Sequence, residues 1–230
     1  MSDVLALMLA SMITPSPRKA DRPIFWIIAG PNGCGKSSLY NRTDIEGWGG
    51  SVWIVNPDLL TQKIIEDEGS IGDAANLAAV ERIEEWLKHS IEVYQTIGVE
   101  TVLSTPKYRA LMEHAHKRGF EVRMIYVLLK HAELQLERIR LRVSEGGHDV
   151  PEDKVRSRRQ RSLEQLAWFA PKVDELWIYD NSTGKPELIG SKKSDMIIRI
   201  RSWPKDLAEA FSAADVKIGH LGDPDSWKLL

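Results

Sequence analysis

The sequence is poor in cysteine and has no long apolar run. Cys34 is the single cysteine among 230 residues, so no disulfide can form within the chain. This excludes a disulfide-stapled secreted scaffold and fits a reducing cytoplasm. No apolar stretch reaches the ~20 residues that a membrane-spanning helix needs. We therefore expect a cytoplasmic protein that does not cross a membrane.

An excess of positive charge is also missing. The chain has 31 Lys and Arg against 33 Asp and Glu, so it offers no overall basic field for nucleic acid. The apolar run Val4–Ile13 follows Asp3 rather than the positive residues of a signal peptide. It favours a short helix packed on the domain or docked on a partner, and Pro15 and Pro17 then indicate a linker.

The most informative motif is a phosphate-binding loop. The apolar run Ile24–Ala29 leads into Gly30-Pro31-Asn32-Gly33-Cys34-Gly35-Lys36-Ser37, which fits G-x-x-x-x-G-K-S. Glycines let backbone N–H groups approach a phosphate, and the helix that begins near Lys36 directs its positive end at the same anion. We predict that ATP or GTP binds from Gly30 to Ser38, with Lys36 at the β- and γ-phosphates and Ser37 at Mg²⁺.

Strand-like and helix-like segments alternate after this motif. Apolar runs predict strands at 51–55, 99–103, 122–129, 176–179 and 196–200. Helical periodicity and helix stop signals lie between them, which predicts a P-loop NTPase/kinase-like α/β fold. We expect a three-layer sandwich with a mostly parallel central sheet and a helical arginine lid. The expected parts are an N-terminal helix and linker (1–22), a kinase domain (23–203), and a C-terminal helix with a loosely attached tail (204–230).

Three acids are candidates for chemistry at the rim of this sheet. Asp58 follows the second predicted strand, where a carboxylate can accept a proton from a hydroxyl or help to hold Mg²⁺. A helix N-cap is the alternative role for Asp58. Glu100 lies in an apolar strand, and because burial of an unpaired carboxylate is costly, it should face a polar cleft or pair with a cation, unless it lies on an exposed edge. Asp180 resembles a Walker B acid, but we rank it below Asp58 for the metal.

The segment 138–161 is rich in arginine. It holds eight basic residues and four acids in two predicted helices joined by Gly146-Gly147. One interpretation is a solvated hairpin with surface ion pairs. We favour a lid that closes arginines over the triphosphate, because Lys36 is otherwise the only cation there. The interleaved acids argue against nucleic acid as the ligand.

Taken together, these motifs resemble the zeta-toxin-like kinases over about 24–189. The shared segments are the P-loop, Asn56-x-Asp58, Glu100-Thr101-x-Leu103-Ser104, Arg138-x-x-x-Arg142, Gly146-Gly147-His148-x-Val150-Pro151, Arg158, Arg161-Ser162-Leu163 and Asp180-Asn181-Ser182. The segment around His148 is the most specific. The resemblance implies a kinase that uses ATP or GTP to phosphorylate the sugar 3′-hydroxyl of UDP-N-acetylglucosamine. Many members of the family are toxins held inactive by an antitoxin protein.

The resemblance also implies roles for single residues. Lys36 and Ser37 would hold phosphate and Mg²⁺, and Asp58 would be the general base. The position of Asp58 after the second predicted strand makes it a candidate for Mg²⁺ as well. Arg142 and Arg158 would be the lid cations. The substrate side would consist of Asn56, Glu100, Thr101, Ser104, Arg138 and His148.

One position departs from the family pattern. A hydroxyl residue usually stands two places after the strand glutamate, and this chain has Val102 there. Residues two apart in a strand share a face, so Val102 would remove a hydrogen-bond donor beside Glu100. The departure bears on the acceptor substrate more than on phosphate transfer.

Two other functions stay open. The kinase could act on another nucleotide, a dinucleotide or a nucleic-acid end, and nucleic-acid binding would weaken steeply with salt. Alternatively, the chain could be a non-catalytic ATP-gated interaction module with Val4–Ile13 as its partner helix. Cys34 either fills a variable P-loop position or is a thiol whose pKa the helix N-terminus lowers, so that its oxidation blocks ATP.

Overall fold

The computed structural model describes residues 22–40, 52–68, 73–145 and 150–220. Its strands form one sheet in the order β2-β3-β1-β4-β5-β6-β7-β8. The strands are β1 (Ile24–Ala29), β2 (Ile54–Val55), β3 (Ile97–Thr101), β4 (Glu121–Leu128), β5 (Glu175–Asp180), β6 (Glu187–Lys193), β7 (Met196–Arg199) and β8 (Ile218–His220). The first five run parallel, β6 is antiparallel to both β5 and β7, and β8 is parallel to β7.

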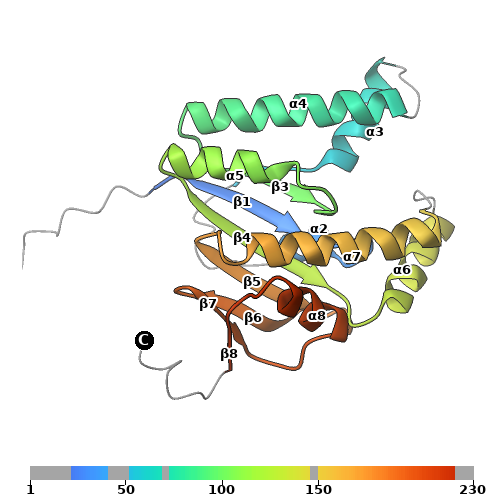
Figure 1. Ribbon diagram of the computed structural model, residues 1–230. Helices are drawn as coiled ribbons and strands as arrows, with labels where there is room; N and C mark the ends of the chain where they lie inside the picture. The colour runs from blue at the N-terminus through green and yellow to red at the C-terminus, as the bar shows by residue number, and fades with distance from the viewer. Residues whose placement is uncertain (1–21, 41–51, 69–72, 146–149, 221–230) are drawn as a thin grey trace, which may run out of the picture.

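Helices connect the parallel strands and cover the sheet (Figure 1). They are α2 (Lys36–Tyr40), α3 (Pro57–Glu68), α4 (Asp73–Glu92), α5 (Tyr108–Lys117), α6 (Ala132–Ser144), α7 (Glu152–Phe169) and α8 (Lys205–Ala213). Figure 1 shows α4, α5, α7 and α8 side by side over one face of the sheet, whereas α6 projects beyond the end of β4.

The apolar run of β1 explains its central position. Phe25 and Ile27 pack in the large core under α4, α5, α7 and α8, whereas Trp26 and Ile28 pack on the opposite face with Leu39 of α2. Period-two alternation places these pairs on opposite faces, and a strand buried on both faces must be apolar throughout. The prediction of a mostly parallel α/β sheet in a P-loop kinase fold is confirmed.

The C-terminal part differs from the sequence-based expectation. Strand β6 was not predicted, because its sequence ELIGSKK is too polar to give a strand pattern. Residues expected to form a loose tail include β8, which pairs with β7 through Ile197–Ile218. Helix α8 buries Leu207 and Phe211 in the main core. In the described ranges, no helix is both long and apolar enough to cross a membrane.

Candidate active site

The site lies where two neighbouring parallel strands end. In the β1–β3 register Ala29 pairs with Thr101, so the P-loop after β1 and the segment after β3 leave the sheet at the same edge. A cavity of about 530 Å³ opens between them. Because the family resemblance predicts substrate contacts at Thr101 and Ser104, we call the segment 102–105 the acceptor loop. The cavity is lined by Asn32, Gly33, Gly35, Lys36, Ser37, Ser38, Asn56, Pro57, Glu100, Thr101, the acceptor loop, Lys107, Tyr108, Arg138, Arg142 and Arg158.

The P-loop backbone takes conformations that only glycine adopts without strain. Gly30 has φ +145° and Gly35 has φ +90°. A Cβ atom at Gly30 would collide with the carbonyl oxygen of Val127, and one at Gly35 would collide with the side-chain amide of Asn181. Asn181 Nδ2 also donates to the carbonyl oxygen of Cys34 at 2.9 Å. The loop that follows β5 therefore supports the backbone of the P-loop through Asn181.

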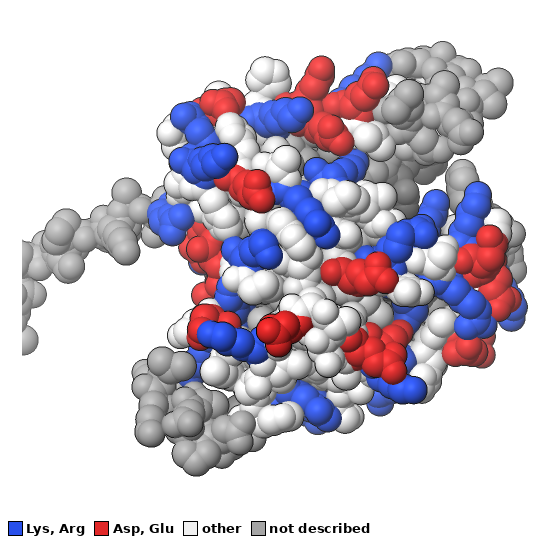
Figure 2. All heavy atoms as spheres, viewed as in Figure 1, with Lys and Arg blue, Asp and Glu red and all other residues white. Residues whose placement is uncertain are grey.

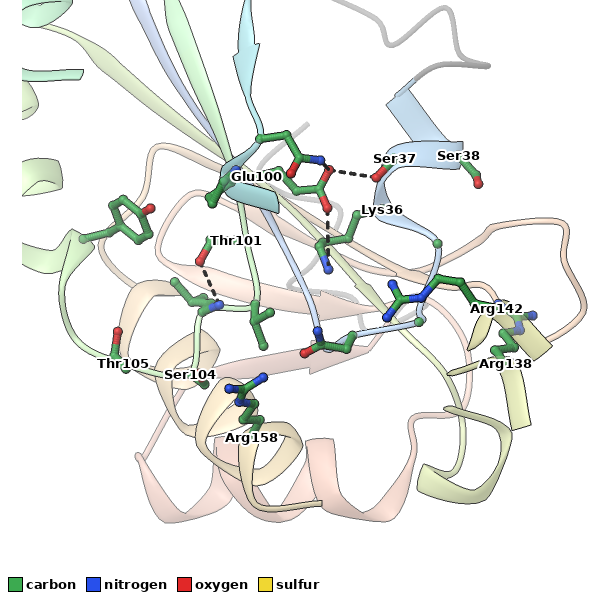
Figure 3. A pocket seen from close by; sticks show the side chains of 18 of the residues that line it. Lys36, Ser37, Ser38, Glu100, Thr101, Ser104, Thr105, Arg138, Arg142 and Arg158 are labelled. Atoms are coloured by element: carbon green, nitrogen blue, oxygen red, sulfur yellow. Dashed lines mark hydrogen bonds and ion pairs between the residues drawn. The ribbon is translucent and has the colours of Figure 1, made fainter. Parts of the chain in front are cut away.

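Lys36, Ser37 and Glu100 form a polar cluster in the cavity (Figure 3), and Asn56 joins it through Glu100. Ser37 Oγ donates to Glu100 Oε2 at 2.9 Å, and Asn56 Nδ2 donates to the same oxygen at 3.0 Å. Lys36 Nζ lies 3.8 Å from Glu100 Oε1 and donates to the carbonyl oxygens of Gly30 and Pro31 at 2.8 and 3.2 Å. These partners compensate the burial of the Glu100 carboxylate, as the sequence predicts for an acid in an apolar strand.

Three arginines of the predicted lid reach the cavity. Arg142 on α6 and Arg158 on α7 extend into it from two different helices (Figure 3). Arg138 also lines it, and its Nη2 donates to the carbonyl oxygens of Asn181 and Ser182 at 2.7 and 3.2 Å. Arg158 therefore places positive charge beside the acceptor loop, whereas Arg138 and Arg142 place it on the P-loop side of the cavity (Figure 3).

Three other described arginines of this segment, Arg140, Arg156 and Arg159, have structural partners. Arg156 pairs with Glu133 and Glu152 on the surface, and Arg140 lies 3.8 Å from Glu152. The surface ion-pair interpretation therefore holds for these two residues. Arg159 is buried under α7, where its Nε donates to Asp206 of α8 at 2.7 Å.

A comparison with protein families matches this chain to one family over most of its length. The family model described as Zeta toxin covers residues 9–193. The chain belongs to the zeta toxin family. Membership confirms the resemblance seen in the sequence and the predicted enzyme class, an ATP-dependent phosphotransferase.

Solved structures share the fold of this chain, and one curated relative matches part of its sequence. The structure of the PezAT toxin–antitoxin system of Streptococcus pneumoniae is 14% identical, with TM-score 0.60 and 92% of each chain covered. The AvrRxo1-ORF1:AvrRxo1-ORF2 complex with ATP is 16% identical, with TM-score 0.59, covering 85% of this chain and 64% of that one. An uncharacterized protein of Haemophilus influenzae is 26% identical over 140 residues, which are 60% of this chain and 92% of that protein.

The structure brings together most, but not all, of the residues that the zeta toxin resemblance singles out. Asn56, Glu100, Thr101, Ser104 and Arg138 line the same cavity as the P-loop. Gly30, Pro31 and Cys34 belong to the P-loop but do not line the cavity. Asp58 is the second residue of α3 and follows β2 closely, and its side chain lies outside the described residues. His148 lies outside them as well.

Two sequence interpretations change at this site. Strand β3 ends at Thr101, so Val102 belongs to the acceptor loop rather than sharing a strand face with Glu100, although both residues line the cavity. The side chain of Cys34 is buried, and this burial raises the pKa of its thiol. A lowered pKa was the basis of the oxidation hypothesis, so the structure favours an unreactive thiol.

Sequence reasoning missed several contributors. Glu100 was not predicted to contact Ser37, because only the parallel pairing of β3 with β1 places it there. Lys107 lines the cavity next to Tyr108, and burial lowers its pKa although Glu84 lies 3.7 Å away. The motifs containing Ser162 and Asn181 were noticed only as resemblances, and no property of these residues in the sequence indicated their contacts.

Proposed function

We propose that this protein transfers the γ-phosphate of ATP to a hydroxyl of a nucleotide-sugar such as UDP-N-acetylglucosamine. The observation that carries the proposal is the single cavity that joins the P-loop to the acceptor loop, with Arg142 and Arg158 extending into it. Phosphate transfer needs donor and acceptor in one enclosed space with cations around the transferred group. The cavity offers such an arrangement.

The P-loop side would bind the nucleotide and Mg²⁺. Lys36 would exchange a backbone carbonyl oxygen for phosphate oxygens, because its ammonium group already lies inside the loop. Ser37 Oγ and Glu100 Oε2, 2.9 Å apart, are oxygen donors of the kind that Mg²⁺ prefers. When bound, Mg²⁺ would neutralise charge that develops on the phosphates. The AvrRxo1-ORF1:AvrRxo1-ORF2 structure was solved with ATP, which supports ATP as the nucleotide of this chain, and GTP stays an alternative.

The acceptor side would hold and activate the hydroxyl group. Asn56, Thr101 and Ser104 supply hydrogen-bonding groups to the cavity that Glu100 also lines, and Arg138 and His148 would complete this side. Asp58 stands near the start of α3, at the sheet edge that carries Asn56, and would take the proton from the attacking hydroxyl. Arg142 and Arg158 would stabilise the transferring phosphoryl group.

An antitoxin protein is the partner that the comparisons favour. The PezAT structure is described as a toxin–antitoxin system, and the AvrRxo1 structure is a complex of two proteins. We propose that this chain likewise has an inhibitory partner. Co-purification from the native host with the chain as bait, in the presence and absence of ATP, tests this part of the proposal.

A nucleic-acid end is a less favoured acceptor. A fold relative occurs in the Pnkp1/Rnl/Hen1 RNA repair complex, at 14% identity and TM-score 0.52, covering 67% of this chain and 49% of that one. However, positive and negative side chains alternate over the face formed by α4, α5, α7 and α8, with no extended basic stripe there (Figure 2). A nucleic-acid track needs such a stripe.

The test is phosphate transfer from γ-labelled ATP with Mg²⁺. The acceptors are UDP-N-acetylglucosamine, other UDP-sugars, free nucleotides, NAD and an RNA with a free 5′-hydroxyl, and Lys36→Ala serves as the blank. Label on UDP-N-acetylglucosamine supports the proposal. Label on another compound would identify that compound as the acceptor instead. ATP binding without any transfer would favour the non-catalytic module. Asp58→Asn should lower turnover at least about 10²-fold if Asp58 is the base.

A further inference from the structure

The acceptor loop has a strained backbone that needs support. Leu103 has φ +57°, a left-handed conformation that is uncommon for a residue with a branched side chain, and its side chain is buried. The amide N–H of Leu103 donates to Thr101 Oγ1 at 3.0 Å, which tightens the turn after β3. Such conformations persist only where the surrounding structure holds them. The question is therefore what fixes the loop from the other side.

A buried hydroxyl of helix α7 provides this support. Ser162 Oγ donates to the carbonyl oxygen of Val102 at 2.6 Å, and the Ser162 side chain is fully buried. Tyr126 on β4 is also fully buried, and its hydroxyl lies 2.8 Å from Ser162 Oγ. Ser162 has one hydroxyl proton and gives it to Val102, so Tyr126 must be the donor to Ser162. The three residues form a chain of hydrogen bonds from the sheet through α7 to the acceptor loop.

The same helix carries a cation of the cavity. Arg158 precedes Ser162 by four residues, so both lie on one face of α7. Arg158 lines the cavity, whereas Ser162 binds the backbone of the loop that lines it. A shift of α7 would therefore move the Arg158 guanidinium and the acceptor loop together.

We propose that Ser162 is a positioning residue for the acceptor. It ties the acceptor loop to the helix that carries Arg158, so that the loop is preformed and holds the acceptor at a fixed position relative to the Arg158 guanidinium. The inference rests on the proposed function, because it takes the segment after β3 as the acceptor side. Ser162 is not itself among the residues that line the cavity, and the residue through which it reaches the lining is Val102.

The test measures the KM for the acceptor and the KM for ATP separately. In Ser162→Ala we expect the KM for UDP-N-acetylglucosamine to rise about tenfold, because the Val102 carbonyl loses its buried donor. The KM for ATP should stay within about twofold, since the P-loop contacts are unchanged. Ser157→Ala is the matched control, because Ser157 Oγ bonds only within its own helix, to Lys154 at 3.3 Å. It should behave as the wild type.

A second variant excludes a general loss of stability. Ser162→Ala alone leaves the Tyr126 hydroxyl buried without its acceptor, whereas Ser162→Ala with Tyr126→Phe removes both polar groups. The double variant should regain thermal stability and still show the raised acceptor KM. Tyr126→Phe alone keeps the Ser162–Val102 bond and should change the acceptor KM by less than about threefold. A double variant with wild-type acceptor KM, or a parallel rise in the KM for ATP, would overturn the inference.

Hydrogen exchange gives an answer that does not depend on the acceptor. If the wild type phosphorylates no UDP-sugar, the proposed acceptor fails, but the role of Ser162 is still measurable. In the unliganded double variant, amides of residues 102–108 should exchange faster, while those of the P-loop keep their protection. Unchanged exchange in 102–108 would refute the positioning role whatever the acceptor is.

Discussion

The phosphate-binding side and the acceptor side of the cavity are shaped by different kinds of contact. The P-loop owes its shape to its own glycines and to Asn181, whose amide donates to the backbone of Cys34. The acceptor loop contains no glycine, and a strained Leu103 is held by the hydroxyl groups of Thr101 and Ser162. The turn of the first side is specified by a short motif and supported by one distant side chain, whereas the second side has no such motif and depends on Ser162, which is distant in sequence. Changes on each side should therefore affect different kinetic constants.

The largest effect is expected on the phosphate side. Lys36→Ala removes the only lysine inside the P-loop, and transfer should fall by about 10³-fold or more because transition-state charge loses its fixed cation. Lys130→Ala is the control, since that lysine is exposed and lies near Asp180. Turnover with labelled ATP measures both variants. Activity of Lys36→Ala within tenfold of the wild type would contradict the assignment of the P-loop as the donor site.

The sequence predicts this side better because its information is local. The motif from Gly30 to Ser37 determines its own turn, and the apolar run before it determines a central strand. Glu100 was predicted to need a polar partner, but Ser37 as that partner follows only from strand order. Ser162 lies 60 residues from Val102, and no local pattern encodes which carbonyl its hydroxyl will meet. Strand β6 was missed for a related reason. Its own residues have a weak preference for a strand, and its pairing with β5 and β7 makes it one.

The second prediction concerns the cation shared by both sides. Arg158→Ala should lower kcat by about 10²-fold with a smaller change in either KM, because its charge is needed most in the transition state. Arg161→Ala is a matched control, since Arg161 lies on the same helix, is exposed and does not line the cavity. Steady-state kinetics with both substrates varied provides the measurement. Equal losses in the two variants would mean that general charge, rather than position, matters.

The third prediction targets the support beneath the P-loop. Asn181→Ala removes the donor to the Cys34 carbonyl, and the KM for ATP should rise about fivefold while the KM for the acceptor stays constant. Thr183→Ala is the control in the same loop, because Thr183 is exposed and its hydroxyl bonds only to Lys185. Together with Ser162→Ala, this variant tests the separation of the two sides. If Asn181→Ala raised the acceptor KM as much as the KM for ATP, the two sides of the cavity would be coupled, and their proposed separation would be wrong.

The smallest effect is expected where the chain departs from its family. Val102 lines the cavity while its carbonyl is held by Ser162, so a change of its side chain should leave the loop in place. Val102→Thr adds a hydroxyl of nearly the same shape, and the KM for UDP-N-acetylglucosamine should fall about threefold through one added hydrogen bond. Val102→Ala tests whether added space alone lowers the acceptor KM, because it removes methyl groups without adding a hydrogen-bond donor. An equal fall in both variants would show that bulk at position 102, and not the missing hydroxyl, limits the acceptor. A rise in KM with Val102→Thr alone would indicate an acceptor that presents an apolar surface to this loop.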